Sequence, residues 1–157
     1  MDLSARCADH VKVGALSGSL GFLLRLAQLR AFDEFFSDRG PRGLKPGEFS
    51  VLWVIACNPG IRQSALGHRL MIKRAHMTKL VRVLEEQGFV SREIPDADRR
   101  AVELTLTQAG QSAVETAASA FFAYEETTGA PLKKSEQAQL IALLQKYVGL
   151  EEEQACR

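Results

Sequence analysis

Leucine and phenylalanine recur every three or four positions between residues 14 and 37. This spacing predicts a long helix. Further apolar residues, Leu26, Leu29 and Phe36, widen the apolar stripe, so the helix must be covered on several sides. The turn-rich stretch SDRGPRGLKPGE then breaks the pattern.

A second helix is predicted from Pro46 to Cys57. Proline suits the first helical position because its missing N–H would have no partner there. Glu48 places a negative charge in the positively polarised first turn. Asn58, Pro59 and Gly60 then end the helix.

Two shorter helices follow across a tight turn, from Gln63 to Leu70 and from about Lys73 to Gln87. In the second helix, apolar residues stand at positions i, i+3, i+4 and i+7, which buries one face and exposes the others. These residues are Met77, Leu80, Val81 and Leu84. Gly88 is suited to ending the helix.

The pattern then changes to that of a hairpin, because Phe89 to Ile94 and Ala101 to Leu106 are strand-like. The turn-prone segment PDADRR lies between them. Helix, turn, helix, strand, loop and strand are the elements of a winged helix-turn-helix. The predicted fold class is therefore mainly α with a small β wing.

Two more helices are expected towards the C-terminus. Thr107 is a good N-cap for a helix over about Gln108 to Thr128, and a last helix is predicted from near Ser135 to Val148. With the first helix, these segments flank the predicted winged helix-turn-helix on both sides.

The composition is that of a soluble globular protein, with 46% hydrophobic and 25% charged residues among 157. No run of about 18 apolar residues and no secretory signal is present, so the expected location is the cytoplasm, without membrane contact. Cys7, Cys57 and Cys156 are far apart and match no zinc spacing. We expect reduced thiols, no metal site and no cofactor.

The net charge of +1 conceals an uneven distribution. Residues 62 to 100 hold nine basic and five acidic side chains, a balance of +4, whereas residues 101 to 157 hold four basic and eight acidic, a balance of −4. A basic segment can be a solvated face or the contact surface for a polyanion. Here it coincides with the predicted second helix and loop tip, which favours binding of double-stranded DNA.

The run from Leu66 to Gly110 resembles the DNA-binding core of the MarR family of bacterial transcriptional regulators. The residues that carry the resemblance are Leu66, Leu70, Leu80, Leu84, Glu85, Gly88, Val90, Arg92, Asp98, Arg99, Arg100, Leu106, Thr107 and Gly110. Upstream, Leu44, Pro46, Glu48 and Phe49 resemble the start of the family's second helix. The family commonly has glycine in the turn where this chain has Met71, and Ala75 and His76 also depart from its pattern.

The winged helix-turn-helix geometry predicts the DNA-contacting residues, since a helix fits the major groove and a wing arginine fits the minor groove. Base reading is assigned to Arg74, Ala75, His76, Thr78 and Lys79 on the second helix, and the minor groove to Arg99. Arg82 and Arg100 are expected to make phosphate or structural contacts. Gln63 and Ser64 are expected to contact phosphate, and Asp98 to orient an arginine.

The resemblance implies a homodimer in which the first and last helices of both subunits interlace, and two winged lobes read a pseudo-palindromic operator. The corresponding division is residues 10–40 for an N-terminal dimerisation helix, 44–110 for the DNA-binding domain and 111–150 for C-terminal dimerisation helices. The alternative is that the apolar terminal stripes close the core of a monomer.

Members of the family commonly bind small anionic or aromatic effectors, which implies a ligand-responsive repressor. Candidate effector residues are Phe22, Arg25, Arg30, Phe32, Phe49 and Trp53. Their mixture of aromatic and basic side chains suits a phenolic acid or its coenzyme A thioester. The alternative is that these aromatic residues are core residues.

Two other functions are alternatives. One is redox sensing through Cys7, because some members of the family sense peroxides with a cysteine near the first helix. Another is a winged-helix interaction module without DNA binding. An enzyme is not expected, since no catalytic motif is present and no catalytic residue can be named.

Overall fold

The computed structural model describes residues 11–36 and 43–150. These residues form two compact units. The winged unit contains residues 43–122, and the terminal-helix unit contains residues 11–36 and 123–150. Within the described residues, no helix is long and apolar enough to span a membrane.

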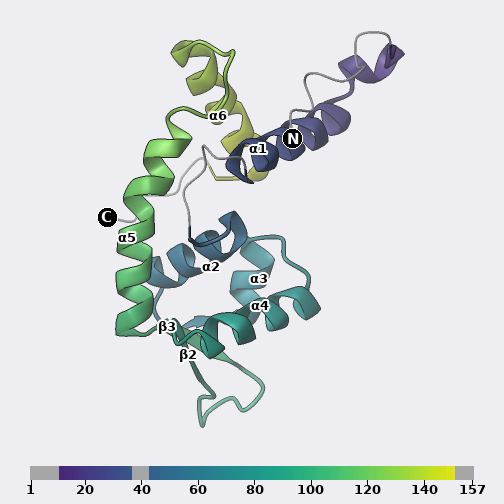
Figure 1. The fold of residues 1–157 in the computed structure, drawn as a ribbon. Coiled ribbons are helices and arrows are strands. Elements are labelled where there is room, and N and C mark those ends of the chain that lie inside the picture. The colour runs from purple at the N-terminus through teal and green to yellow at the C-terminus, as the bar shows by residue number, and fades with distance from the viewer. Residues whose placement is uncertain (1–10, 37–42, 151–157) are drawn as a thin grey trace. The chain divides into compact units, whose positions relative to one another are not determined.

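Apart from the short strand β1, the winged unit has the predicted order of elements (Figure 1). They are α2 (Pro46–Cys57), β1 (Ile61–Arg62), α3 (Gln63–Arg69), α4 (Arg74–Glu86), β2 (Val90–Glu93), β3 (Glu103–Leu106) and the greater part of α5 (Gln108–Glu125). The prediction of a mainly α fold with a small β wing is confirmed. The predicted helix over residues 108–128 ends earlier, at Glu125.

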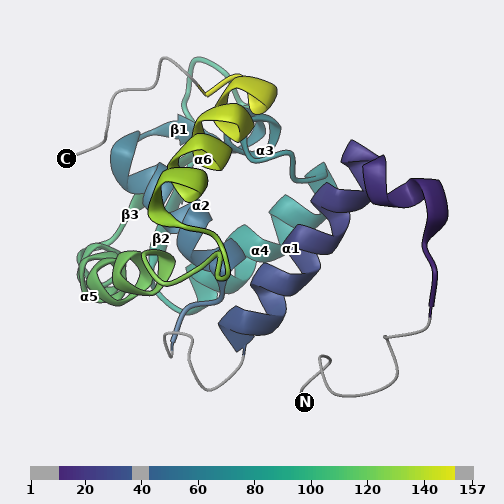
Figure 2. The same ribbon diagram turned by 90° about the horizontal axis from the view of Figure 1, so that it is seen from above.

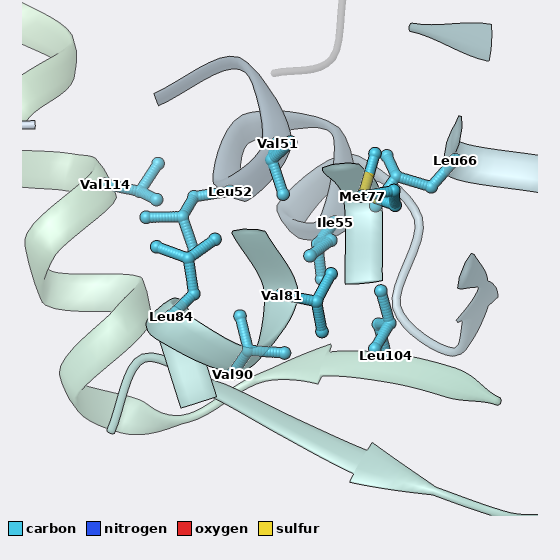
Figure 3. Close-up of a cluster of buried hydrophobic side chains, with 10 residues drawn as sticks. All are labelled: Val51, Leu52, Ile55, Leu66, Met77, Val81, Leu84, Val90, Leu104 and Val114. Carbon is cyan, nitrogen blue, oxygen red and sulfur yellow. The ribbon is translucent and has the colours of Figure 1, made fainter. Parts of the chain in front are cut away.

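The core of this unit is made by apolar side chains from all of its helices and from its strands β2 and β3. Figure 3 shows them pointing toward one another. They are Val51, Leu52, Ile55, Leu66, Met77, Val81, Leu84, Val90, Leu104 and Val114. Burying each leucine or isoleucine contributes about 1.5–3 kcal/mol. This core therefore fixes α3 and α4 against the sheet.

The sheet is antiparallel, with strand order β1-β3-β2. Ile61 pairs with Leu104, and Val90 pairs with Leu106. The sequence pattern did not predict β1, because a two-residue strand shows no alternation. The loop between β2 and β3 extends from the sheet as the wing tip (Figure 1).

Local hydrogen bonds account for the predicted helix boundaries. The carboxylate of Glu48 accepts the backbone N–H of Lys45 at 3.0 Å, which caps α2. Gly88 has φ +78°, as expected for a glycine after a helix. The Thr107 hydroxyl accepts the N–H of Gly110 at 3.0 Å, so this residue caps α5 as predicted.

The turn between α3 and α4 places a non-glycine residue in the left-handed region. Met71 has φ +53° and is 84% exposed. We expect Met71→Gly to raise the free energy of unfolding by about 0.5–1 kcal/mol, because relief of the backbone strain exceeds the entropy gained by the unfolded chain. Urea titration would measure this. Met71→Val should be less stable than the wild type, and a loss of stability in Met71→Gly would contradict the interpretation.

The terminal-helix unit contains a 3-10 helix, η2 (Gly14–Gly18), then α1 (Leu20–Phe36) and α6 (Lys134–Val148). A view from above shows α1 and α6 (Figure 2). The helix predicted from residue 14 onward is thus a 3-10 helix at its start, and its α-helical part begins at Leu20. Arg30 Nη2 donates to the carbonyl oxygen of Ala130 at 2.6 Å, and the Phe35 and Tyr124 rings meet edge to face at 5.5 Å.

Candidate nucleic-acid interface

Helix α4 separates buried apolar residues from exposed polar ones. Met77, Val81 and Leu84 are buried, as their spacing predicts. The predicted contact residues on the other faces are all exposed: Arg74, Ala75, His76, Thr78, Lys79 and Arg82. The helix can therefore present these side chains to a partner without disturbing the core.

A hydrogen-bonded chain connects α3 to α4. Gln63 Nε2 donates to Thr78 Oγ1 at 3.2 Å, and Thr78 Oγ1 donates to the carbonyl oxygen of Arg74 at 2.9 Å. The structure thus brings Gln63 and Thr78 together, which spacing alone could not show. The Thr78 hydroxyl already donates one hydrogen bond and accepts another within the protein, so its methyl group and one acceptor lone pair are left for contact with bases.

Four of the predicted residues line a single hollow between α3, the start of α4 and the end of the wing loop. They are Gln63, Ser64, Arg74 and Arg100. Ser64 is exposed in the first turn of α3. The hollow therefore has several donors on one surface.

Asp98 organises the wing loop. Its Oδ1 accepts the backbone N–H of Arg100 at 3.2 Å, and its Oδ2 lies 3.5 Å from Arg62 Nη1. Its own carbonyl oxygen accepts the N–H of Ala101 at 2.9 Å. Arg99, between these anchored positions, is exposed. These contacts leave Arg99 at a tip whose neighbours are held in place.

Arg62 is a positioning residue that the sequence analysis did not single out. It lies in β1, the strand that was not predicted, and its partner Asp98 is in the wing loop. The only sequence feature that pointed to Arg62 was its place in the basic segment, residues 62 to 100. The ion pair links the base of the sheet to the wing.

We expect Arg62→Gln and Asp98→Asn each to weaken DNA binding about threefold, corresponding to ~0.7 kcal/mol. The two changes alter net charge in opposite directions, so charge alone predicts opposite effects. If the ion pair anchors the wing, both variants should bind DNA more weakly. Fluorescence anisotropy with a duplex would test this, and tighter binding by Asp98→Asn would contradict the anchoring role. Stability should change little, because the pair is solvent-exposed.

Two further ion pairs flank the exposed face of α4. Arg82 Nε donates to Glu86 at 2.8 Å, and this hydrogen bond raises the pKa of the Arg82 guanidinium. Arg92 Nη1, on β2, lies 3.1 Å from Glu85. Arg82 is thus partly neutralised by its neighbour, and a phosphate contact by its guanidinium would have to compete with Glu86.

The candidate effector residues belong to both units. In the winged unit, Phe49 is buried and stacks on Phe121 at 4.2 Å, while Trp53 meets Phe122 edge to face at 5.1 Å. The sequence analysis missed Phe121 and Phe122, although an aromatic pair in a predicted helix was the signal. A hollow of about 410 Å³ between α2 and α5 is also lined by Trp53.

The other four candidates lie on α1 in the terminal-helix unit. Phe22 is half-buried, whereas Arg25 and Phe32 are exposed. Arg30 is engaged by Glu34 at 2.8 Å and by the carbonyl oxygen of Ala130. Arg25 is therefore a freer cation for an anionic ligand than Arg30.

The expectation of three reduced thiols is wrong at Cys57. This half-buried residue at the end of α2 is disulfide-bonded in the structure. Cysteines that are odd in number and far apart in sequence gave no sign of this bond. Cys7 lies outside the described residues, so redox sensing through it remains a prediction.

Comparison with known proteins places this geometry in a family. The sequence profile of the MarR family matches residues 44–102. A Thauera aromatica protein assigned to transcriptional regulation of the hcr operon is 36% identical over 134 residues, covering 85% of this chain and 81% of the relative.

Solved structures of similar proteins support the same family assignment. The transcriptional repressor CouR bound to a 23-mer DNA duplex is 31% identical, with a TM-score of 0.77 over 87% of this chain and 97% of that chain. CouR bound to p-coumaroyl-CoA is 29% identical, with a TM-score of 0.75 over 87% of this chain and 96% of that one. These relatives are transcriptional regulators and not enzymes. The chain belongs to the MarR family of winged helix-turn-helix transcriptional regulators.

Proposed function

We propose that this protein is a homodimeric repressor that binds a pseudo-palindromic DNA operator and is released by an aromatic acid or its coenzyme A thioester. The observation that carries the proposal is the exposed polar face of α4 beside an anchored wing arginine. A relative with this fold was solved both on duplex DNA and with p-coumaroyl-CoA, which supports both parts.

The DNA contacts follow from the two exposed elements of the winged unit. Helix α4 enters the major groove, where Arg74, His76 and Lys79 reach base edges. Arg99 enters the adjacent minor groove, whose negative potential favours a guanidinium. Arg82, Arg100 and Ser64 contact phosphates and fix the register of the protein on the duplex.

The homodimer is supported by apolar surface on the terminal-helix unit. Many large apolar side chains of α1 and α6 are between 42% and 63% exposed in the single chain. They include Leu20, Leu23, Leu26, Leu29, Phe32, Phe36, Leu140, Ile141 and Leu143. A solvated monomer rarely leaves so much contiguous apolar surface uncovered. A second copy of the chain would bury this surface and supply a second recognition helix for the other half-site of the operator.

Arg99→Ala should weaken binding to the preferred duplex at least tenfold, or about 1.4 kcal/mol. The side chain is exposed at the wing tip and can insert into the minor groove without rearrangement. A gel-shift assay measures the change. Lys146→Ala, which removes an exposed cation from α6, is the matched control and should bind as the wild type does. Unchanged affinity in Arg99→Ala would remove this residue from the interface.

The regulatory part is tested with a duplex selected from a random pool for tight binding. p-Coumaroyl-CoA should raise the melting temperature of the DNA-free protein and weaken its DNA complex, since a ligand that favours the DNA-free state must do both. Parallel titrations with free coenzyme A and with p-coumarate separate the contributions of the coenzyme A and aromatic halves of the thioester. Stabilisation by none of these compounds would contradict the effector class, and absence of any selected duplex would overturn the repressor itself.

A further inference from the structure

We propose that helix α4 selects DNA by a thymine methyl group, which Ala75 and Thr78 contact through their own methyl groups, and that Gln63 positions Thr78 for this contact. The inference rests on the proposed function and adds the base that the bound duplex must contain. Its basis is the hydrogen-bonded chain between α3 and α4, two helices that pack against each other in the winged unit (Figure 1).

Ala75 and Thr78 form a small apolar stripe on the exposed surface of α4. They stand three positions apart in the helix, so their side chains lie on the same side of it. Both residues are exposed, whereas Met77, between them in the sequence, is buried in the core. The cations Arg74 and Lys79 flank the pair in the sequence. The helix thus offers two methyl groups together with hydrogen-bond donors.

The hydroxyl group of Thr78 is occupied within the protein. Thr78 Oγ1 donates to the carbonyl oxygen of Arg74 at 2.9 Å and accepts from Gln63 Nε2 at 3.2 Å. A helical threonine divides between two χ1 rotamers, because its hydroxyl can bond to the preceding turn. The added bond from Gln63 favours the observed rotamer. The methyl group of Thr78 is therefore held in one direction while it stays available to a partner.

The surroundings of Gln63 fix its side chain for this role. Its backbone N–H donates to the carbonyl oxygen of Val102 at 2.8 Å, which ties the start of α3 to the residue before β3. The amide nitrogen must face Thr78, because the hydroxyl proton of Thr78 already goes to Arg74. Gln63 Oε1 is buried without a hydrogen-bond partner among the described residues. Gln63 is thus a positioning residue that acts on DNA through Thr78.

A pair of methyl groups favours thymine over the other bases. In the major groove, thymine alone presents a methyl group, at C5. The other groups on the base edges are hydrogen-bond donors and acceptors, which would lose water against a methyl group without gaining a partner. Burying one methyl group changes affinity about fourfold. The helix therefore prefers thymine where Ala75 and Thr78 meet the groove.

The test replaces each thymine of a tightly bound selected duplex, one position at a time, with deoxyuridine. This change removes the C5 methyl group and leaves the base pair intact. Fluorescence anisotropy with the full-length protein should identify a position in each half-site where the change weakens wild-type binding about fourfold. Thr78→Ser keeps the hydroxyl but lacks the methyl group. It should lower this thymine-to-deoxyuridine ratio below about twofold, and Ala75→Gly should do the same.

The role of Gln63 is read from the same ratio. Gln63→Met cannot donate to Thr78 and should lower the ratio to about twofold, because the methyl group loses its fixed direction. A merely structural role would weaken binding to both duplexes by the same factor. Thr116→Ser is the matched control, since this exposed threonine of α5 donates to the carbonyl oxygen of Ser112 at 2.8 Å and loses the same methyl group. It should keep the wild-type ratio.

Two outcomes would overturn the proposal and leave the proposed function standing. One is a wild-type protein that binds every deoxyuridine duplex as tightly as the parent duplex. The other is a Thr78→Ser protein that keeps the full wild-type ratio. The scan with the wild-type protein decides even if a variant does not fold. If no duplex can be selected, the proposed function fails and the thymine preference fails with it, so the two kinds of failure are distinguishable.

Discussion

Gly110→Ala is expected to lower the free energy of unfolding by about 3 kcal/mol or more, in the upper range for overpacking. A Cβ at this position would lie 2.0 Å from the carbonyl oxygen of Phe89 and 2.9 Å from its carbonyl carbon. These are backbone atoms, which cannot move aside as the end of a side chain can. The start of α5 would have to move away from Phe89, the residue that precedes β2.

That separation would also break the hydrogen bonds that hold α5 in place. The Thr107 hydroxyl donates to the carbonyl oxygen of Gly88, and the N–H of Thr107 donates to the carbonyl oxygen of Phe89 at 3.0 Å. Urea denaturation followed by circular dichroism measures the loss.

Gly47→Ala is the matched control for this change. It lies in α2, and a Cβ there meets nothing within 4 Å. Helix propensity predicts that this variant gains up to about 1 kcal/mol. If Gly110→Ala were as stable as Gly47→Ala, the close approach of α5 to Phe89 would not exist in solution.

Leu29→Asp is expected to convert the dimer to a monomer and to weaken operator binding by more than about 100-fold, because the second half-site is no longer bound in the same event. Leu29 is 50% exposed on α1 and belongs to its apolar surface. A carboxylate buried at an interface between copies would have no partner. Sedimentation gives the oligomeric state, and anisotropy gives the affinity.

Gln28→Asp places the same charge at the neighbouring exposed position of the same helix. It should remain dimeric and bind DNA nearly as the wild type does, because it removes no apolar contact. A Leu29→Asp protein that stays dimeric would show that this surface is not the interface. A monomer that keeps full affinity would refute the need for two lobes.

The sequence predicted the winged unit well because its helices and β3 bury one face. Met77, Val81 and Leu84 recur at helical spacing and are buried as a set. The two-residue strand β1 escaped prediction because period-2 alternation needs more residues to be visible. The early end of α5 escaped as well, since no glycine or proline stands at Glu125 to mark it.

The candidate site was predictable as a set of exposed residues but not as a network. Arg99 and Arg100 follow from their place in a turn-prone tip between two strands. The partnership of Asp98 with Arg62 joins residues 36 positions apart in sequence, and nothing local indicates it. The same holds for the hydrogen bond between Gln63 and Thr78, which exists only because the core sets α3 against α4.

The salt dependence of affinity shows whether α4 and the wing bind duplex DNA through its backbone and grooves. Between about 50 and 200 mM salt, six or more phosphate contacts in the dimer should weaken binding on the order of 10³-fold, with a linear log–log slope. We expect this steep decline for the wild type. A flat response, or no duplex binding at low salt, would contradict it.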